Sequence, residues 1–290
     1  SYMPELPEVE VVRRSLQSFI KGLQIKKVSV FNRNLRYKIS RDFDKKIINQ
    51  KIIFIRRRSK FLLLGLQNHS VILMHLGMTG KIFIINNSSK KVFKTSFYYE
   101  NEINKKHNHI IIKFNKFIKL IYNDVRKFGF VKIIPSGSIK ENNHLRLLGP
   151  EPLNKDFNIK YLNTKIKNIK KNIKNLLMDQ KLVSGLGNIY VNEILHLSSV
   201  NPLKVSKNLK IHQAKKIVKN VKTILLKAIK SGGSSIRDFK GALGKKGNFQ
   251  QKFMVYDRNG QVCKKIGCRG KIKKIYISNR STFYCLKCQK

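Results

Sequence analysis

A proline and a glutamate near the start of the chain could act together as an amine nucleophile and its acid partner. They lie in the stretch Pro4-Glu5-Leu6-Pro7-Glu8. If the chain began at Pro4, the ring nitrogen would be a free secondary amine, able to attack an aldehyde-level carbon and form an iminium ion. Behind Ser1-Tyr2-Met3, the same nitrogen is a tertiary amide without a proton and cannot react in this way. A proline-led helix start with acidic first-turn residues fits the same stretch.

A second chemical pattern is formed by the cysteines near the end of the chain. The chain has 4 cysteines, arranged as Cys263-x4-Cys268 and Cys285-x2-Cys288. Two close pairs at this spacing are typical of four thiolate ligands around tetrahedral zinc in a reducing compartment. Two disulfides are the alternative, and they suit a secreted protein. Because the N-terminus lacks a signal-peptide pattern, we expect one structural Zn2+.

One glycine-containing stretch could bring the backbone close to a ligand. Leu182–Tyr190 has two glycines before a predicted helix start near Asn188, where free amides would face a phosphate. A simple glycine-containing helix connection is the alternative. Ser231–Ser235 and Gly241–Asn248 are also rich in glycine, and they predict a flexible loop after a long helix.

The composition points to a polyanionic partner. The chain has 290 residues, 62 Lys and Arg, 15 Asp and Glu, a formal net charge of +47 and 41% hydrophobic residues. Such a charge on a chain that can form a core indicates nucleic acid first and an anionic membrane surface second. A drift toward Lys, Ile and Asn, as in Asn163–Asn175, would also raise the charge. No apolar run is long enough to span a membrane, and we expect a cytoplasmic, nucleoid-associated monomer.

Periodicity predicts the elements that would position these residues. Val9 to Ile20 has helical spacing ending at Gly22, and short β-rich runs follow, which suggests a sandwich or flattened barrel. The runs are Lys26–Phe31, Ile52–Arg56, Phe61–Leu66, Val71–Leu76, Lys81–Ile85, Ile110–Phe114, Phe117–Tyr122 and Phe130–Ile134. Leu148–Leu153, with two prolines and a glycine, is the predicted linker.

Beyond the linker the pattern becomes helical. Ile166, Ile169, Ile173, Leu176 and Leu177 fall on one helical face, and Leu209–Ile229 predicts a longer amphipathic helix. Lys271–Ile277 and Ser281–Tyr284 provide strands between the cysteine pairs. A ribbon this short folds because a metal replaces a hydrophobic core.

Six short motifs along the chain together resemble those of a known protein family. They are Pro4–Glu8, Arg58-Ser59-Lys60-Phe61, His75–Gly80, Asp124–Gly129, Gly187–Tyr190 and the four-cysteine tail. In this order and at these intervals the chain resembles formamidopyrimidine-DNA glycosylases, which are bacterial base-excision repair enzymes. Leu6, where the sibling endonuclease VIII group typically has glycine, and the long Ile236–Asn248 loop favour this family over its sibling.

The resemblance implies an α+β multidomain fold. It has a catalytic β-sandwich with a leading helix (4–136), a linker (137–153), a helix-two-turn-helix domain with a lesion-capping loop at 236–248 (154–250), and a zinc-ribbon finger (251–290). DNA would lie in the cleft between the domains. The implied substrate is double-stranded DNA containing oxidised purines, such as 8-oxoguanine and formamidopyrimidines, or abasic sites. The implied activity combines base excision with strand cleavage by β,δ-elimination.

The resemblance also implies roles for single residues. Pro4 would attack C1′, Glu5 would act as the acid, and Lys60 would bind phosphate and assist proton transfer. Met78, Arg126 and Phe128 would fill the space left by a flipped base, although core packing is the alternative for Met78 and Phe128. The remaining DNA-binding residues implied by the family motifs are His75, Asn188, Lys245 and Arg280. Four thiolates leave no open position on zinc, so the metal would be structural.

The chain departs from the family pattern at four positions. Ser59 stands where glycine is usual, Val125 where proline is usual, Lys127 where arginine is usual, and Asn248 where an aromatic residue is frequent. None of these removes a proposed catalytic group. Two other hypotheses remain: an endonuclease VIII-like glycosylase for oxidised pyrimidines, and a non-catalytic zinc-ribbon DNA-binding protein if Pro4 is not the free N-terminus.

Overall fold

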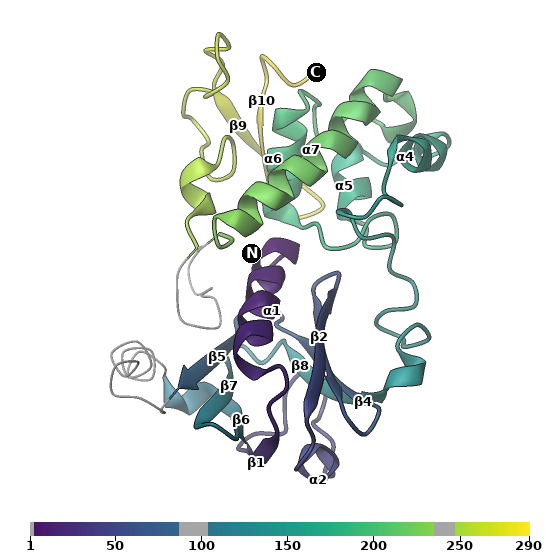
Figure 1. The fold of residues 1–290 in the computed structure, drawn as a ribbon. Helices are drawn as coiled ribbons and strands as arrows, with labels where there is room; N and C mark the ends of the chain where they lie inside the picture. The colour runs from purple at the N-terminus through teal and green to yellow at the C-terminus, as the bar shows by residue number, and fades with distance from the viewer. Residues whose placement is uncertain (1–2, 87–103, 235–246) are drawn as a thin grey trace. The chain divides into compact units, whose positions relative to one another are not determined.

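The chain forms two compact units in the computed structural model, which describes residues 3–86, 104–234 and 247–290. The first unit extends to Arg146 and includes the described ends of the segment 232–248. The second unit contains residues 147–231 and 249–290. The boundary between them falls inside the segment 137–153, and Figure 1 shows the chain passing from the strand-rich unit to the helical one there.

The first unit is a sandwich of two four-stranded antiparallel sheets behind a leading helix, as expected. One sheet has the order β1-β6-β7-β5 and the other β2-β3-β4-β8. The strands are β1 (Ile25–Val30), β2 (Ile52–Arg58), β3 (Phe61–Leu66), β4 (Ser70–His75), β5 (Gly80–Asn86), β6 (Asn108–Phe114), β7 (Ile118–Asp124) and β8 (Phe130–Pro135). The helical pieces are α1 (Leu6–Ile20), α2 (Phe43–Ile47), and the short turns η1 (Lys105–His107) and η2 (Ser136–Ser138). Each predicted β-rich run overlaps one of these strands.

One large apolar core holds the sheets and α1 together. The helix buries Val9, Val12 and Leu16 completely, at the spacing that places them on one face. They pack with side chains from both sheets, such as Leu62 and Ile112. Helix α1 contacts β2, β3 and β5, which fixes it against the sandwich (Figure 1).

The second unit combines helices with one hairpin. Its elements are α4 (Ile159–Ile166), α5 (Ile173–Met178), α6 (Asn188–Leu197), η3 (Ser206–Asn208), α7 (Ile211–Lys230), η4 (Phe249–Lys252), β9 (Ile272–Ile277) and β10 (Arg280–Cys285). Helix α6 is almost wholly buried and contacts α5, α7 and β10. No helix in the described ranges combines the length and apolarity needed to cross a bilayer.

One helical prediction was wrong in detail. The apolar face from Ile166 to Leu177 is divided between α4 and α5, with a break at residues 167–172. The side chain of Asn172 accepts a hydrogen bond from the Asn175 backbone N at 2.8 Å and so begins a new helix. The backbone N of Ile173 bonds to the carbonyl of Lys204 at 2.8 Å rather than to the preceding turn. Periodicity alone does not reveal such a long-range bond.

Residues 147–153, within the expected linker, are held by the second unit. The backbone N of Gly149 donates to the carbonyl of Gln180 at 2.7 Å, and Ser184 N donates to the carbonyl of Pro150 at 3.0 Å. A Cβ on Gly149 would lie 2.6 Å from the Leu182 carbonyl, so only glycine fits this approach. The Lys222 ammonium also bonds to the Pro152 carbonyl at 3.1 Å.

Candidate functional site

The start of α1 buries the proline and its neighbouring carboxylates. Pro4 is buried, and Glu5 and Glu8 are each only 2% exposed. Glu5 occupies the cap position of the helix, and its backbone N donates to the Glu8 carboxylate at 2.9 Å. The helix-start interpretation of this stretch is therefore correct as structure. It does not compete with the chemical one, because a helix cap fixes where Pro4 and Glu5 lie.

Glu8 also contacts Gly233 and Ser234, the residues that directly precede the segment 235–246. Its second oxygen accepts a hydrogen bond from the backbone N of Ser234 at 3.1 Å. Gly233 has a φ of +77° and approaches so closely that a Cβ would lie 2.9 Å from that oxygen. A Cβ on Gly247 would lie 2.1 Å from the carbonyl of Gly233, so the two ends of the segment touch. Lys245 lies outside the described residues.

Lys60 stands in a two-residue turn between β2 and β3. Arg58 pairs with Phe61, which leaves Ser59 and Lys60 as the turn. Ser59 has a φ of +56°, in the left-handed region where glycine is favoured, and Lys60 is only 8% exposed. The Arg57 guanidinium donates to the Ser59 carbonyl at 3.0 Å, which holds the turn in place.

The turn is connected to α1 through a buried ion pair. Arg57 Nε donates to the Glu10 carboxylate at 3.0 Å, and Arg13 and Arg14 bond to the same carboxylate at 2.9 Å. Burial raises the pKa of Glu10, but the hydrogen bonds and charges of these arginines outweigh it and hold the pKa below its ordinary value of 4.5. The carboxylate therefore stays charged and ties the Lys60 turn to the leading helix.

His75 lies at the end of β4 as a neutral hydrogen-bond donor. Its Nδ1 accepts from the backbone N of Gly77 at 3.0 Å, which leaves the proton on Nε2. Burial, followed by the charges of Lys60, Arg36 and His144, lowers the pKa of His75 to about 4. Phe61, the residue after Lys60, pairs with His75 across β3 and β4, so these two predicted site residues lie near each other.

The three proposed base-replacing residues come together in the first unit. Arg126 Nη1 lies 3.4 Å from the Met78 sulfur, and its guanidinium stands 4.7 Å from the centre of the Phe128 ring. Phe128 is 42% exposed, which excludes core packing as the explanation for that residue. A flexible apolar side chain, a planar fork of donors and an aromatic ring thus share one surface.

Asp124 organises the loop that carries Arg126 and Phe128. This carboxylate is fully buried. It accepts hydrogen bonds from the Thr79 hydroxyl at 2.6 Å, the Tyr122 hydroxyl at 2.9 Å, Lys127 N at 3.1 Å and Gly129 N at 3.0 Å. The Thr79 hydroxyl in turn accepts from Arg126 N at 2.9 Å, so one carboxylate links the Met78 loop to the Arg126 loop.

In the second unit, Asn188 and Arg280 lie beside a lysine that the motifs did not indicate. Asn188 Nδ2 donates to the Ser281 carbonyl at 2.9 Å. The Lys174 ammonium bonds to the Thr282 hydroxyl at 2.5 Å, and burial, then the charge of Arg280, lowers the pKa of Lys174 to about 8. Because the chain has 62 Lys and Arg residues, the sequence gives no reason to select Lys174 as a functional residue. Only the fold identifies it.

The four cysteine sulfurs form a cluster that fits one metal ion. All four lie within 4.8 Å of one another, with Cys268 and Cys285 at 3.5 Å and Cys263 and Cys288 at 3.9 Å. Sulfurs bound tetrahedrally to zinc at about 2.3 Å would be about 3.8 Å apart. A disulfide requires about 2.05 Å, and all four cysteines are free thiols. The disulfide alternative is therefore excluded.

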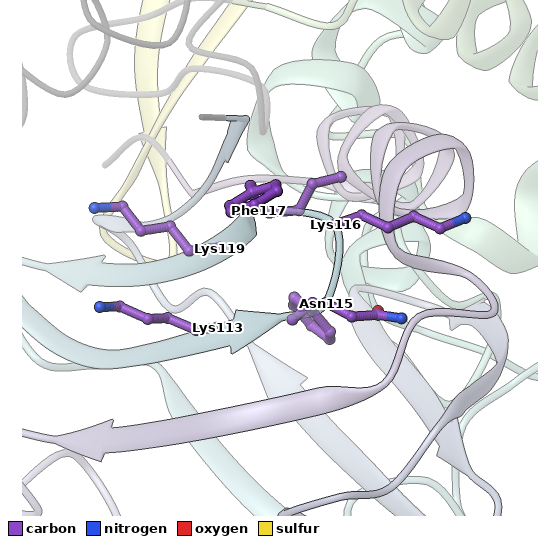
Figure 2. A pocket seen from close by; sticks show the side chains of 7 residues that line it. Lys113, Asn115, Lys116, Phe117 and Lys119 are labelled. Atoms are coloured by element: carbon purple, nitrogen blue, oxygen red, sulfur yellow. The ribbon is translucent and has the colours of Figure 1, made fainter. Parts of the chain in front are cut away.

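A pocket on the β6–β7 hairpin is separate from these groups. Figure 2 shows Lys113, Asn115, Phe117 and Lys119 around it at the hairpin tip. No residue proposed for catalysis, DNA binding or metal binding lines this pocket. The candidate site is therefore the set of side chains described above.

Comparisons with known proteins agree along the whole chain. The family model described as the formamidopyrimidine-DNA glycosylase N-terminal domain matches residues 3–131, and the H2TH domain of the same family matches residues 148–240. The chain is 42% identical over 288 residues to formamidopyrimidine-DNA glycosylase of Rickettsia bellii, covering 99% of this chain and 100% of the relative. It is 39% identical over 294 residues to that of a Bradyrhizobium species (strain ORS 278), with the same coverage.

Solved structures agree as well. The fold matches Lactococcus lactis Fpg in complex with DNA containing an abasic site, with a TM-score of 0.86, 34% identity and 99% coverage of both chains. It also matches a mutant of that protein bound to DNA containing Fapy-dG, with a TM-score of 0.87, 34% identity, and coverage of 99% of this chain and 100% of the other.

Proposed function

The chain belongs to the formamidopyrimidine-DNA glycosylase family and is a base-excision repair glycosylase, and on this premise we propose that Pro4 is its nucleophile. The observation that carries the proposal is the burial of Pro4 and Glu5 together at the start of α1, in the unit matched by the family's N-terminal domain. That match begins at Met3, directly before the proline. A working chain beginning at Pro4 would carry the free amine that the reaction needs.

The proposed reaction has two stages. The Pro4 nitrogen bonds to C1′ of the damaged nucleoside while the bond from C1′ to the base breaks, and the amine proton leaves with the base. Glu5 protonates the ring oxygen, the sugar opens, and a cationic iminium links Pro4 to C1′. This cation withdraws electrons from C2′, so loss of a C2′ proton expels the 3′ phosphate by β-elimination, and δ-elimination then expels the 5′ phosphate.

Base extrusion requires groups that replace the lost base. We assign this role to Met78, Arg126 and Phe128, because they meet on one surface and Phe128 is exposed. Extrusion costs a few kcal/mol, which an inserted apolar side chain and donors to the orphaned base would offset. His75 Nε2–H and the Lys60 ammonium are suited to phosphate in the first unit, and Asn188, Arg280 and Lys174 in the second.

The cysteine cluster is proposed to hold one structural zinc ion. Cys263, Cys268, Cys285 and Cys288 would supply all four ligands, and the ion would cross-link the ribbon without reaching the substrate. Zinc measurement on the purified chain should give about one ion per chain, and Cys285→Ser should lose both zinc and DNA binding. Normal DNA binding without metal would refute this assignment. The nucleoid location stays a prediction, supported by the charge of +47.

Covalent trapping tests the nucleophile. A chain verified by mass to begin at Pro4 is mixed with duplex DNA containing 8-oxoguanine opposite cytosine and reduced with borohydride. We expect a stable protein–DNA adduct. A matched chain that retains Ser1-Tyr2-Met3 should give none, because its proline nitrogen is an amide. Absence of an adduct from the Pro4 chain would rule out the proposed chemistry.

A comparison of two damaged bases tests whether the substrate is an oxidised purine or an oxidised pyrimidine. Excision of 8-oxoguanine opposite cytosine is measured beside excision of thymine glycol by the same preparation. We expect the oxidised purine to be removed faster. A clear preference for thymine glycol would instead support the oxidised-pyrimidine alternative, although the nucleophile would be unchanged.

A further inference from the structure

Helix α6 holds the C-terminal ribbon through four side chains along its length. Asn188 Nδ2 donates to the Ser281 carbonyl at 2.9 Å, and Asn192 Oδ1 accepts from Phe283 N at 2.8 Å. Glu193 accepts from three successive backbone amides, at residues 254–256, at 2.6 to 3.0 Å. The fourth side chain, His196, faces the cysteine cluster rather than the backbone.

His196 meets the sulfurs through a single ring nitrogen. Its Nε2 lies 3.2 Å from Cys263 Sγ and 3.8 Å from Cys288 Sγ. The residue is 1% exposed, and its Nδ1 has no hydrogen-bond partner in the described part of the chain. Since a thiolate accepts but does not donate, the contact assigns the ring proton to Nε2.

A buried imidazole at this position is not explained by packing alone. Leaving Nδ1 without a partner in the interior costs about 1–3 kcal/mol, and an apolar side chain would fill the same space without that cost. The compensating contact available to the ring is the one that Nε2 makes with the sulfurs. Four thiolates around a dication carry an excess of negative charge, which nearby N–H donors relieve.

We propose that His196 donates a hydrogen bond from Nε2 to the metal-bound Cys263 thiolate and is a positioning residue of the metal centre. The proposal rests on the proposed zinc site. The hydrogen bond fixes Cys263 relative to α6, whose first residue, Asn188, is a proposed phosphate ligand. It also lowers the electron density on the Cys263 sulfur, so that this thiolate is harder to alkylate.

Three substitutions in the full chain separate the hydrogen bond from packing. His196→Gln can place an amide N–H where Nε2 stands, His196→Asn is polar but too short to reach, and His196→Met fills the space without a donor. Metal affinity is measured by competition with a chelator. We expect His196→Met and His196→Asn to bind zinc about 10–100-fold more weakly, as happens when a hydrogen-bond partner of a metal ligand is lost. His196→Gln should stay within a few-fold of the parent.

Alkylation of the zinc-loaded chains, read by mass spectrometry at each cysteine, gives a readout specific to the proposed bond. Cys263 should react faster in the Met and Asn variants, while Cys268, which His196 does not contact, serves as the internal control. Equal zinc affinity and equal Cys263 reactivity in all variants would overturn the proposal. So would a Gln variant as impaired as the Met variant, because the effect would then be one of packing. Thermal unfolding of each loaded chain verifies folding, and the Gln–Asn pair remains decisive if the Met variant does not fold.

Cobalt substitution distinguishes the proposed bond from direct ligation. The parent chain with Co2+ should show the absorption of four thiolate ligands, and His196→Met should keep four thiolates while shifting the sulfur-to-metal charge-transfer bands. A parent spectrum of three sulfurs and one nitrogen would make His196 a ligand and overturn the proposal. If the parent chain binds no metal, the zinc site itself is refuted. If zinc affinity and Cys263 reactivity are the same with and without His196, only the role of the histidine is refuted.

Discussion

The Glu8 carboxylate joins the start of α1 to Ser234, a residue 226 positions away in the sequence. One oxygen accepts from Glu5 N at 2.9 Å and the other from Ser234 N at 3.1 Å. Two parts of the proposed site, the Pro4-Glu5 start and the entry to the 235–246 segment, are thereby held by one side chain. Glu8 acts as an orienting group whose two oxygens are both occupied by backbone donors.

Glu8→Gln should therefore weaken both structure and reaction. The amide keeps one acceptor but turns an NH2 group toward the second backbone N–H, so one buried donor loses its partner. We expect the free energy of unfolding to fall by about 1–3 kcal/mol, measured by urea denaturation. The rate of borohydride trapping on an abasic duplex should fall as well. Glu141→Gln, at an exposed carboxylate, is the matched control, and equal effects of the two substitutions would contradict the orienting role.

Asp124→Asn tests whether one carboxylate organises the base-replacing loop. Four donors converge on Asp124, and an asparagine can accept through only one oxygen while its NH2 group faces the others. We expect a loss of about 3 kcal/mol or more, because several buried donors lose a charged acceptor. Thr79→Val removes one of the four bonds to Asp124, together with the bond from Arg126 N, at nearly constant volume. It should cost less, because the carboxylate and its other three donors remain. If the two variants were equally stable in urea, the shared carboxylate would not be the organising group.

Much of the fold was predictable because its signals are local. Each β-rich run overlaps a strand, since strand periodicity is visible within a few residues. The break between α4 and α5 was not predictable, because it depends on a backbone bond from Ile173 to Lys204. The cysteine cluster was anticipated from spacing, whereas the contact between Cys263 and His196 joins residues 67 positions apart.

In the candidate site, too, the sequence indicated single residues but not the contacts between residues far apart in the chain. Motifs indicated Met78 and Arg126, but their contact, across 48 residues, and the carboxylate that arranges it became visible only in three dimensions. Lys174 was missed because its chemical type is common in this chain. Its burial, which among the described lysines only Lys60 shares, distinguishes it rather than its residue type.

Glu10 gives the first unit a definite pH dependence. Its pKa in the folded chain is below the ordinary value of 4.5, so the unfolded chain takes up a proton more readily than the folded one. The stability that it contributes is complete above about pH 4.5 and is lost as the pH falls through the lower folded pKa. We expect Glu10→Gln to cost roughly 1–3 kcal/mol at pH 7, and the difference from the parent to shrink in acid. Denaturant titrations at pH 7, 5 and 3.5 measure this, and a difference that grew in acid would refute the assignment.

Ser59 allows backbone strain in the Lys60 turn to be measured separately from side-chain contacts. A side chain at a φ of +56° costs roughly 1–2 kcal/mol that glycine does not incur. Ser59→Ala removes the hydroxyl and keeps the Cβ, whereas Ser59→Gly removes both, so the difference between the two variants isolates the strain. Glycine also loses more conformational freedom on folding, and we therefore expect the Gly variant to be about 1 kcal/mol more stable than the Ala variant. The comparison is made by urea denaturation at pH 7. An Ala variant as stable as the Gly variant would mean that the turn relaxes around the Cβ, and the serine would then impose no strain on the position of Lys60.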